Sequence, residues 1–225
     1  MKEFHGRHEL KHYINFSDVL QLRARLPYVA SIDNNAVEGN GYRVKSLYFD
    51  NYNDKALKEK VDGVNEREKF RLRLYNDDIS LIRLEKKSKK NGLCFKESAI
   101  ITAEECTRLL DGDLAVLKEN GNQLCQELYT KMHYQQLRPK NIVDYQREAF
   151  IYPMGNVRIT LDYDIRTSLS IYDFMKMDSI PIPIPGVYIL EVKYDCFLPE
   201  IIRGMVSLSS RRSTAFSKYA VTRIV

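Results

Sequence analysis

The sequence predicts an α+β fold built on an antiparallel sheet, with short helices between the strands. Charged and apolar residues alternate with a period of two along several segments, as side chains do on the two faces of a strand. The chain also holds 15 Tyr and 9 Phe, and aromatic side chains suit a pleated surface. A length of 225 residues is within the range of one large domain, so we expect a single domain over residues 1–225.

Eight segments have the composition and alternation of strands. In chain order they are 7–14, 42–50, 66–75, 80–88, 93–101, 142–151, 156–164 and 187–195. The pattern is clearest at 67–73, where apolar residues separate a series of bases at every second position: Arg67, Lys69, Arg71 and Arg73. The same alternation recurs near both ends of the chain, at 7–12 and 190–195.

Seven segments between these strands are predicted to be helical, at 17–26, 53–61, 103–110, 113–119, 122–136, 199–208 and 214–223. Asn53 is the predicted N-cap of the second helix, which ends before Gly63. Thr102 and Glu105 form a capping-box pattern at the start of the third. The prolines at 181, 183 and 185 predict an extended connector.

Each predicted strand has a charged face and an apolar face, which leaves two interpretations of the sheet. An open antiparallel sheet would place its charged face in water and its apolar face under the helices. A closed barrel would enclose the charged face and use it to bind an anion and a metal. The barrel is favoured because a solvated face needs no repeated pattern, whereas E-x-K recurs on three strands: Glu9/Lys11, Glu85/Lys87 and Glu191/Lys193.

Composition excludes several classes of protein. The net charge of +5 permits a polyanionic partner without requiring one. The chain is charged from Lys2 onward, and three prolines interrupt its longest apolar stretch at 180–190, so we predict no signal peptide, no membrane span and a cytoplasmic location. Basic clusters interleaved with exposed aromatic residues are lacking, and we therefore expect no nucleic-acid partner.

Phosphate binding, if present, must come from side chains, because no glycine-rich phosphate loop occurs in the chain. Arg71 and Arg73 stand about 7 Å apart on one strand face, and guanidinium forks match phosphate oxygens. Taken alone, R-x-R is a common surface pattern and is more typical of a structural or solvated pair than of a binding site. Glu191 follows an apolar stretch, where a carboxylate either pairs with a base or binds a cation such as Mg²⁺ or Mn²⁺.

Residues His8 to His12 match the H-E-x-x-H motif of zinc proteases, which requires a helix. On a strand the two histidines stand about 13 Å apart, which is too far for one zinc ion. We interpret the match as chance.

Eight short segments occur in the order of a known family. They are R-H-E-L-K at 7–11, S-L-Y-F-D at 46–50, K-F-R-L-R at 69–73, I-R-L-E-K-K at 82–87, Y-Q-R-E-A-F at 145–150, V-R-I-T-L-D at 157–162, I-L-E-V-K-Y at 189–194 and F-S-K-Y at 216–219. In these segments the chain resembles the VTC domain, the polyphosphate polymerase branch of the triphosphate tunnel metalloenzymes, a superfamily that includes the CYTH proteins. The resemblance implies a closed antiparallel eight-stranded β tunnel with helices packed on its outside.

The resemblance also implies an activity and a site. It implies a phosphotransferase that moves the γ-phosphate of ATP to a growing inorganic polyphosphate chain, with Mn²⁺ or Mg²⁺ as cofactor. The residues that match the family's catalytic positions are Arg71, Arg73, Arg158 and Lys193. The same four would bind substrate phosphates together with Lys11, Lys87, Lys96, Arg147 and Lys218. Glu191 matches the metal ligand.

The chain departs from the wider superfamily at its start. The E-x-E-x-K triad of many CYTH proteins reads Arg7-x-Glu9-x-Lys11 here, so a base replaces one acidic ligand. This favours the VTC branch over a two-metal hydrolase. Two alternatives stay open: a tunnel triphosphatase that hydrolyses nucleoside triphosphate or tripolyphosphate, and a non-catalytic polyphosphate-binding module. The presence of Glu191 argues against the second, since a pure anion binder gains nothing from a carboxylate.

Overall fold

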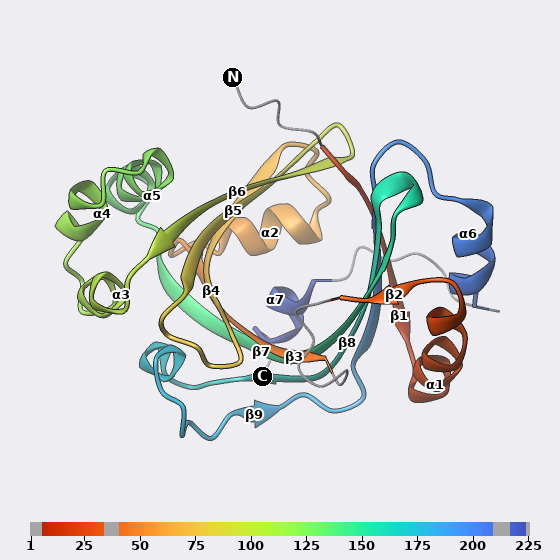
Figure 1. Ribbon diagram of the computed structural model, residues 1–225. Helices are drawn as coiled ribbons and strands as arrows, with labels where there is room; N and C mark the ends of the chain where they lie inside the picture. Colours follow the sequence, from red (N-terminus) through yellow and green to blue (C-terminus); the bar gives the residue numbers. More distant parts are fainter. Residues whose placement is uncertain (1–5, 34–40, 209–216, 224–225) are drawn as a thin grey trace.

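The computed structural model describes residues 6–33, 41–208 and 217–223. One strongly curved sheet runs through them (Figure 1). Its strands follow the order β1 (His8–Ile14), β10 (Tyr188–Tyr194), β8 (Val157–Thr167), β7 (Arg138–Tyr152), β3 (Tyr42–Asp50), β4 (Arg67–Tyr75), β5 (Ile82–Lys90) and β6 (Leu93–Ile101). Two short strands pair at its sides, β2 (Ser31–Ile32) with β7 and β9 (Ile182–Pro183) with β8. All of these pairings are antiparallel.

The edges of the sheet, β1 and β6, form no ladder with each other in the part of the chain that the structure describes. An isolated bridge joins them, in which Arg7 and Cys94 exchange two backbone hydrogen bonds of 3.0 Å. The predicted α+β class and the eight predicted strands are therefore confirmed. The closed tunnel is not confirmed, because hydrogen bonding does not continue around the sheet.

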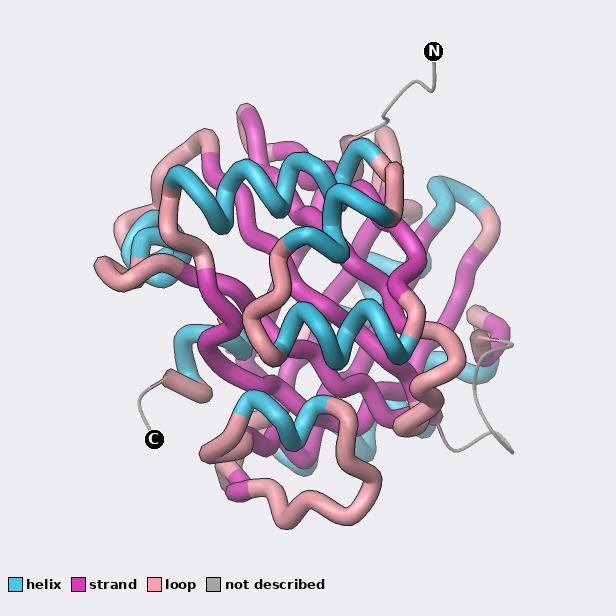
Figure 2. Tube along the Cα trace, turned by 90° about the vertical axis from the view of Figure 1, so that its left-hand side faces the viewer, coloured by secondary structure: helices cyan, strands magenta, loops and turns pink. Residues whose placement is uncertain are grey.

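Helices cover the convex face and also enter the concave one. On the convex side, α3 (Ala103–Leu110), α4 (Ala115–Glu119) and α5 (Gln123–Tyr134) lie over β4, β5 and β6, as Figure 2 shows. A second group, α1 (Phe16–Arg25) and α6 (Glu200–Val206), packs over β8 and β10. Inside the curve lie α2 (Lys55–Val61) and α7 (Lys218–Val221) (Figure 1). None of the described helices is long and apolar enough to cross a membrane.

The alternation in the sequence explains this layering. The apolar positions of β4 point to the convex side, where Phe70, Leu72 and Leu74 are fully buried beneath α3 and α5. Burying such side chains contributes roughly 1.5–3 kcal/mol each. The intervening charged residues are thereby fixed on the concave face, and the same holds for β8, whose Ile159 packs under α1 and α6.

Helix ends test the capping predictions. The capping box is confirmed: the Glu105 N–H donates to Thr102 Oγ1 at 3.1 Å, and the Thr102 N–H donates to the Glu105 carboxylate at 2.7 Å. The last helix, predicted at 214–223, is α7, although 214–216 lie outside the described residues.

The predicted N-cap Asn53 is wrong. Helix α2 begins after Asp54, and the buried carboxylate of Asp50 accepts the N–H groups of Ala56 and Leu57 at 2.9 and 3.2 Å. The cap is thus supplied from the end of β3. Asp50 also accepts the Tyr219 hydroxyl at 2.8 Å, so one carboxylate holds both α2 and α7.

Candidate functional site

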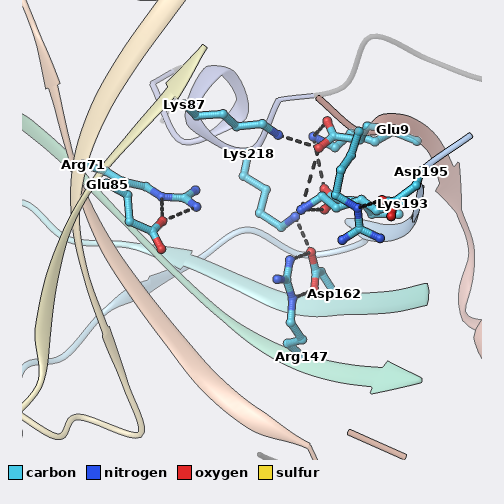
Figure 3. Close-up of polar contacts among 12 residues, drawn as sticks. Glu9, Arg71, Glu85, Lys87, Arg147, Asp162, Lys193, Asp195 and Lys218 are labelled. Atoms are coloured by element: carbon cyan, nitrogen blue, oxygen red, sulfur yellow. Dashed lines mark hydrogen bonds and ion pairs between the residues drawn. The ribbon is translucent and has the colours of Figure 1, made fainter. Parts of the chain in front are cut away.

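Charged side chains gather on the concave face of the sheet and point toward one another (Figure 3). They come from β1, β4, β5, β6, β7, β8, β10 and α7. The acids are Glu9, Glu85, Asp162 and Glu191, and the bases that contact them are Lys11, Arg71, Arg73, Lys87, Lys96, Arg147, Lys193 and Lys218. The structure therefore brings together every predicted site residue except Arg158.

One cluster is centred on Glu85, which is only 1% exposed. Arg71 approaches its Oε2 with Nε at 2.8 Å and Nη2 at 2.6 Å, and Lys96 approaches Oε1 at 2.5 Å. Arg73 lies farther away, at 3.7 Å. Burial alone would raise the pKa of Glu85, but these three cations hold that pKa well below its usual range. The carboxylate is ionised and occupies the guanidinium fork of Arg71.

A second cluster is centred on Asp162. The Arg147 guanidinium binds it through two hydrogen bonds, from Nε at 2.7 Å and from Nη2 at 2.8 Å. Lys218 reaches the same carboxylate from α7 (Figure 3). Burial opposes ionisation of Asp162, yet Arg147 and Lys218 lower its pKa. The C-terminal helix is thus tied electrostatically to the centre of the sheet.

The third cluster pairs two acids with three lysines. Lys11 Nζ bridges the carboxylates of Glu9 and Glu191 at 2.8 and 3.2 Å, and Lys193 Nζ lies 2.7 Å from Glu191. Lys87 contacts Glu9 at 2.5 Å. Burial and mutual repulsion would raise the pKa values of both acids, but the surrounding lysines hold them well below the usual range.

The surroundings of Glu191 suit a hard divalent cation. Carboxylate oxygens of Glu9 and Glu191 meet at the same lysine, and oxygen donors are what Mg²⁺ and Mn²⁺ prefer. Thr160, the cross-strand neighbour of Glu191, is 2% exposed and its Oγ1 has no hydrogen-bond partner among the described residues. Those residues hold no group of three or more His, Cys, Asp or Glu that could bind a metal alone.

Arg158 stands apart from these clusters. Its guanidinium contacts the Asp33 carboxylate and donates to the Tyr42 hydroxyl at 2.9 Å. The alternation along β8 correctly gave its face of the sheet. The alternation could not reveal that Asp33 is the partner of Arg158, because Asp33 lies 125 residues away along the chain.

Sequence reasoning missed two groups beside Arg71. Arg71 Nη1 donates to the Tyr48 hydroxyl at 2.9 Å, and Lys69 Nζ lies 5.2 Å from the centre of the Tyr48 ring. Burial would raise the pKa of Tyr48, but Arg71, Lys69 and Arg73 lower it to about 6. Lys69 was visible in the alternation of β4, whereas Tyr48 is an uncharged residue of a mostly buried strand, so the charge pattern gave no signal for it.

A cavity of about 370 Å³, which we call the α2 cavity, adjoins the third cluster. Its charged lining residues are Glu9, Lys11, Lys60, Arg67, Glu68, Lys69, Lys87 and Lys89. Lys60 comes from α2 and the others from β1, β4 and β5. The contribution of Lys60 had no signal in the sequence, because the position of a short helix against a sheet is not a local property.

The VTC domain family matches residues 6–224 of this chain. Comparison with curated proteins gives no match.

Solved structures with a similar chain course include a protein from Bacillus halodurans named "putative adenylate cyclase", with 13% identity, a TM-score of 0.48 and coverage of 89% of this chain and 87% of that one. Another is a Pyrococcus horikoshii protein, with 15% identity, a TM-score of 0.46 and coverage of 89% and 84%.

Proposed function

Because the chain belongs to the VTC domain family, we propose that it is an ATP-dependent polyphosphate polymerase. The observation that carries the proposal is the excess of bases over acids among inward-facing side chains of the concave face. Linear polyphosphate and ATP both present rows of anionic oxygens. Such a surface would bind these oxygens without a glycine-rich loop. ATP and inorganic polyphosphate are the proposed substrates.

The proposed reaction needs no side-chain nucleophile. A terminal oxygen of the acceptor chain attacks the γ-phosphorus of ATP, a new P–O–P bond forms, and the bond from the γ-phosphorus to the bridging oxygen breaks to release ADP. The ionised acceptor has no proton to lose. Phosphoryl transfer therefore asks the protein mainly for positioning and for charge stabilisation.

Arg71, Arg73 and Arg147 would supply that positioning, because guanidinium groups bind phosphate oxygens bidentately and remain charged when buried. In the free protein their forks are held by Glu85 and Asp162. A triphosphate has to displace these carboxylates at least partly. Lys193 and Lys218 carry compact ammonium charges. They would stabilise the negative charge that develops on the leaving group during the transfer.

Mn²⁺ or Mg²⁺ would be held by Glu191, with Glu9 beside it, and would neutralise charge on the phosphate oxygens when bound. Glu191→Gln keeps the size of the side chain and removes its charge. We expect polymer synthesis to fall by several orders of magnitude while tripolyphosphate binding persists, since the phosphate-binding arginines remain. Glu200→Gln, an exposed acid of α6, is the matched control.

The test incubates the protein with ATP and Mn²⁺, then resolves polyphosphate on a gel and measures free phosphate in the same reaction. Polymer accumulation supports the proposal. Free phosphate without polymer would assign a triphosphatase, and neither product from any nucleotide would assign a binding module. Near wild-type synthesis by Glu191→Gln would remove Glu191 from the metal site.

A further inference from the structure

The α2 cavity differs from the three paired clusters because several of its cations have no acidic partner. Lys60, Arg67, Lys69 and Lys89 line the cavity, and within the described ranges no carboxylate lies at ion-pair distance from any of them. Elsewhere on the concave face each predicted base contacts an acid.

The two acids of the lining are already neutralised. Glu9 pairs with Lys11 and Lys87, as described above. Glu68 pairs with lysines that lie outside the lining, Lys86 at 3.5 Å and Lys131. Neither acid lies at ion-pair distance from any of the four unpaired cations.

The strand register places two of these cations, Arg67 and Lys89, directly opposite one another. Arg67 faces Lys89 across β4 and β5, and Lys69 faces Lys87, which in turn faces Lys96 on β6. Like charges at directly opposed positions destabilise a sheet. Lys87 and Lys96 are each neutralised by an acid, Glu9 and Glu85, whereas no described carboxylate lies between Arg67 and Lys89. The Arg67–Lys89 row is therefore unfavourable unless an anion lies between the side chains.

The proton affinities of the lysines agree with this reading. Burial, together with Lys11, Arg67 and Lys89, lowers the pKa of Lys60 to about 8. Burial also lowers the pKa of Lys69 to about 7, helped by nearby cations and opposed by Tyr48. A bound anion would reverse both shifts.

Two further features indicate the kind of anion. Ser217, at the start of α7, lines the cavity, is 8% exposed, and its Oγ has no hydrogen-bond partner among the described residues. A hydroxyl in that position suits an oxyanion. None of the described lining residues is aromatic, so this part of the lining offers a nucleobase nothing to stack on. Asp50 fixes both helices at the cavity, which is therefore preformed.

We propose that the α2 cavity binds phosphate units of an inorganic polyphosphate chain, additional to a triphosphate held by the arginine clusters. The proposal rests on the proposed function, because it assigns the polymer to one end of the same concave face. It predicts that a chain of about ten phosphates binds more tightly than tripolyphosphate, since each added charge-assisted contact contributes measurably.

The first test measures the binding of tripolyphosphate and of a ten-unit polyphosphate by calorimetry. The double variant Lys60→Gln/Lys89→Gln should bind the long chain at least about tenfold more weakly, a change of ~1.4 kcal/mol, with a much smaller effect on tripolyphosphate. Lys58→Gln, an exposed lysine of the same helix, is the matched control and should bind both like the wild type.

The second test locates the chain directly. Cys94 is a half-buried thiol of the cavity lining, whereas Cys106 and Cys125 are buried and Cys196 is exposed. In a Cys196→Ser background, the ten-unit chain should slow alkylation of Cys94 by iodoacetamide, and tripolyphosphate should slow it much less.

Equal affinity for the two ligands in the wild type, or unchanged alkylation with the long chain bound, would overturn this inference and leave the proposed function standing. Failure of the wild type to bind either ligand would overturn the proposed function itself.

Discussion

Glu85→Gln tests whether the acids of the concave face occupy the positions that phosphate groups take when a substrate binds. The substitution keeps the side-chain volume and removes the charge that Arg71, Arg73 and Lys96 share. Because Glu85 is 1% exposed, Arg71 and Arg73 would be left with little solvent and no counter-charge, and they would repel each other. Breaking a buried ion-pair network in this way costs roughly 3–5 kcal/mol.

The expected consequences have opposite signs for stability and for binding. At 2–4 °C per kcal/mol for a protein of this size, the melting temperature of the free variant should fall by roughly 6–20 °C. The affinity for tripolyphosphate should rise about tenfold, because the Arg71 fork no longer has to exchange a carboxylate for a phosphate, a contact worth roughly 1.5–3 kcal/mol. Ligand at about 100 times its Kd should return ~2.7 kcal/mol of stability.

Differential scanning fluorimetry and calorimetric titration measure the two effects. Glu97→Gln is the control, because Glu97 is a partly exposed acid of β6 that contacts Lys86 at 3.6 Å and none of the clusters. If Glu85→Gln melted like the wild type, the network would be contributing nothing. If it bound tripolyphosphate more weakly, Glu85 would assist phosphate binding, and the displacement argument would be refuted.

Two further predictions follow from the same contacts. Arg71→Ala or Arg73→Ala should lower tripolyphosphate affinity about tenfold or more, and unchanged affinity in both variants by calorimetry would place the triphosphate elsewhere. Binding of the ten-unit chain should take up protons near pH 8, because the chain raises the pKa of Lys60 from its value of about 8 and the complex then holds more protons than the free protein. Affinity should therefore fall as pH rises above about 8, and Lys60→Gln should lose much of the uptake that calorimetry in buffers of different ionisation enthalpy detects.

Local alternation was sufficient to predict which residues share the concave face. A strand reverses the direction of its side chains at each residue, so once the apolar residues of β4 are placed under the helices, Arg71 and Arg73 must point inward. The same argument applies to Lys11, Lys87 and Lys193 on their strands. These assignments needed no knowledge of the neighbouring strands.

The features that the sequence did not predict depend on contacts between distant segments. The cap of α2 comes from Asp50, which the N-terminal pattern of the helix does not include. The partner of Arg158 is Asp33, which is distant from it in the sequence. The predicted closure of the tunnel is not confirmed, because closure depends on how the curvature of many strands adds up. The isolated Arg7–Cys94 bridge is likewise too small a feature for any local pattern to reveal.

The contrast between paired and unpaired cations predicts the order in which the parts of the concave face bind phosphate. Where Glu85 and Asp162 occupy the arginine forks, an incoming phosphate has to displace an acid, so binding there is an exchange and its net gain is reduced. At Lys60 and Lys89 a phosphate displaces only water and relieves repulsion between opposed cations. We therefore expect a phosphate chain to be captured first at the α2 cavity and to reach the arginine clusters afterwards, since its first contacts there require no carboxylate to leave.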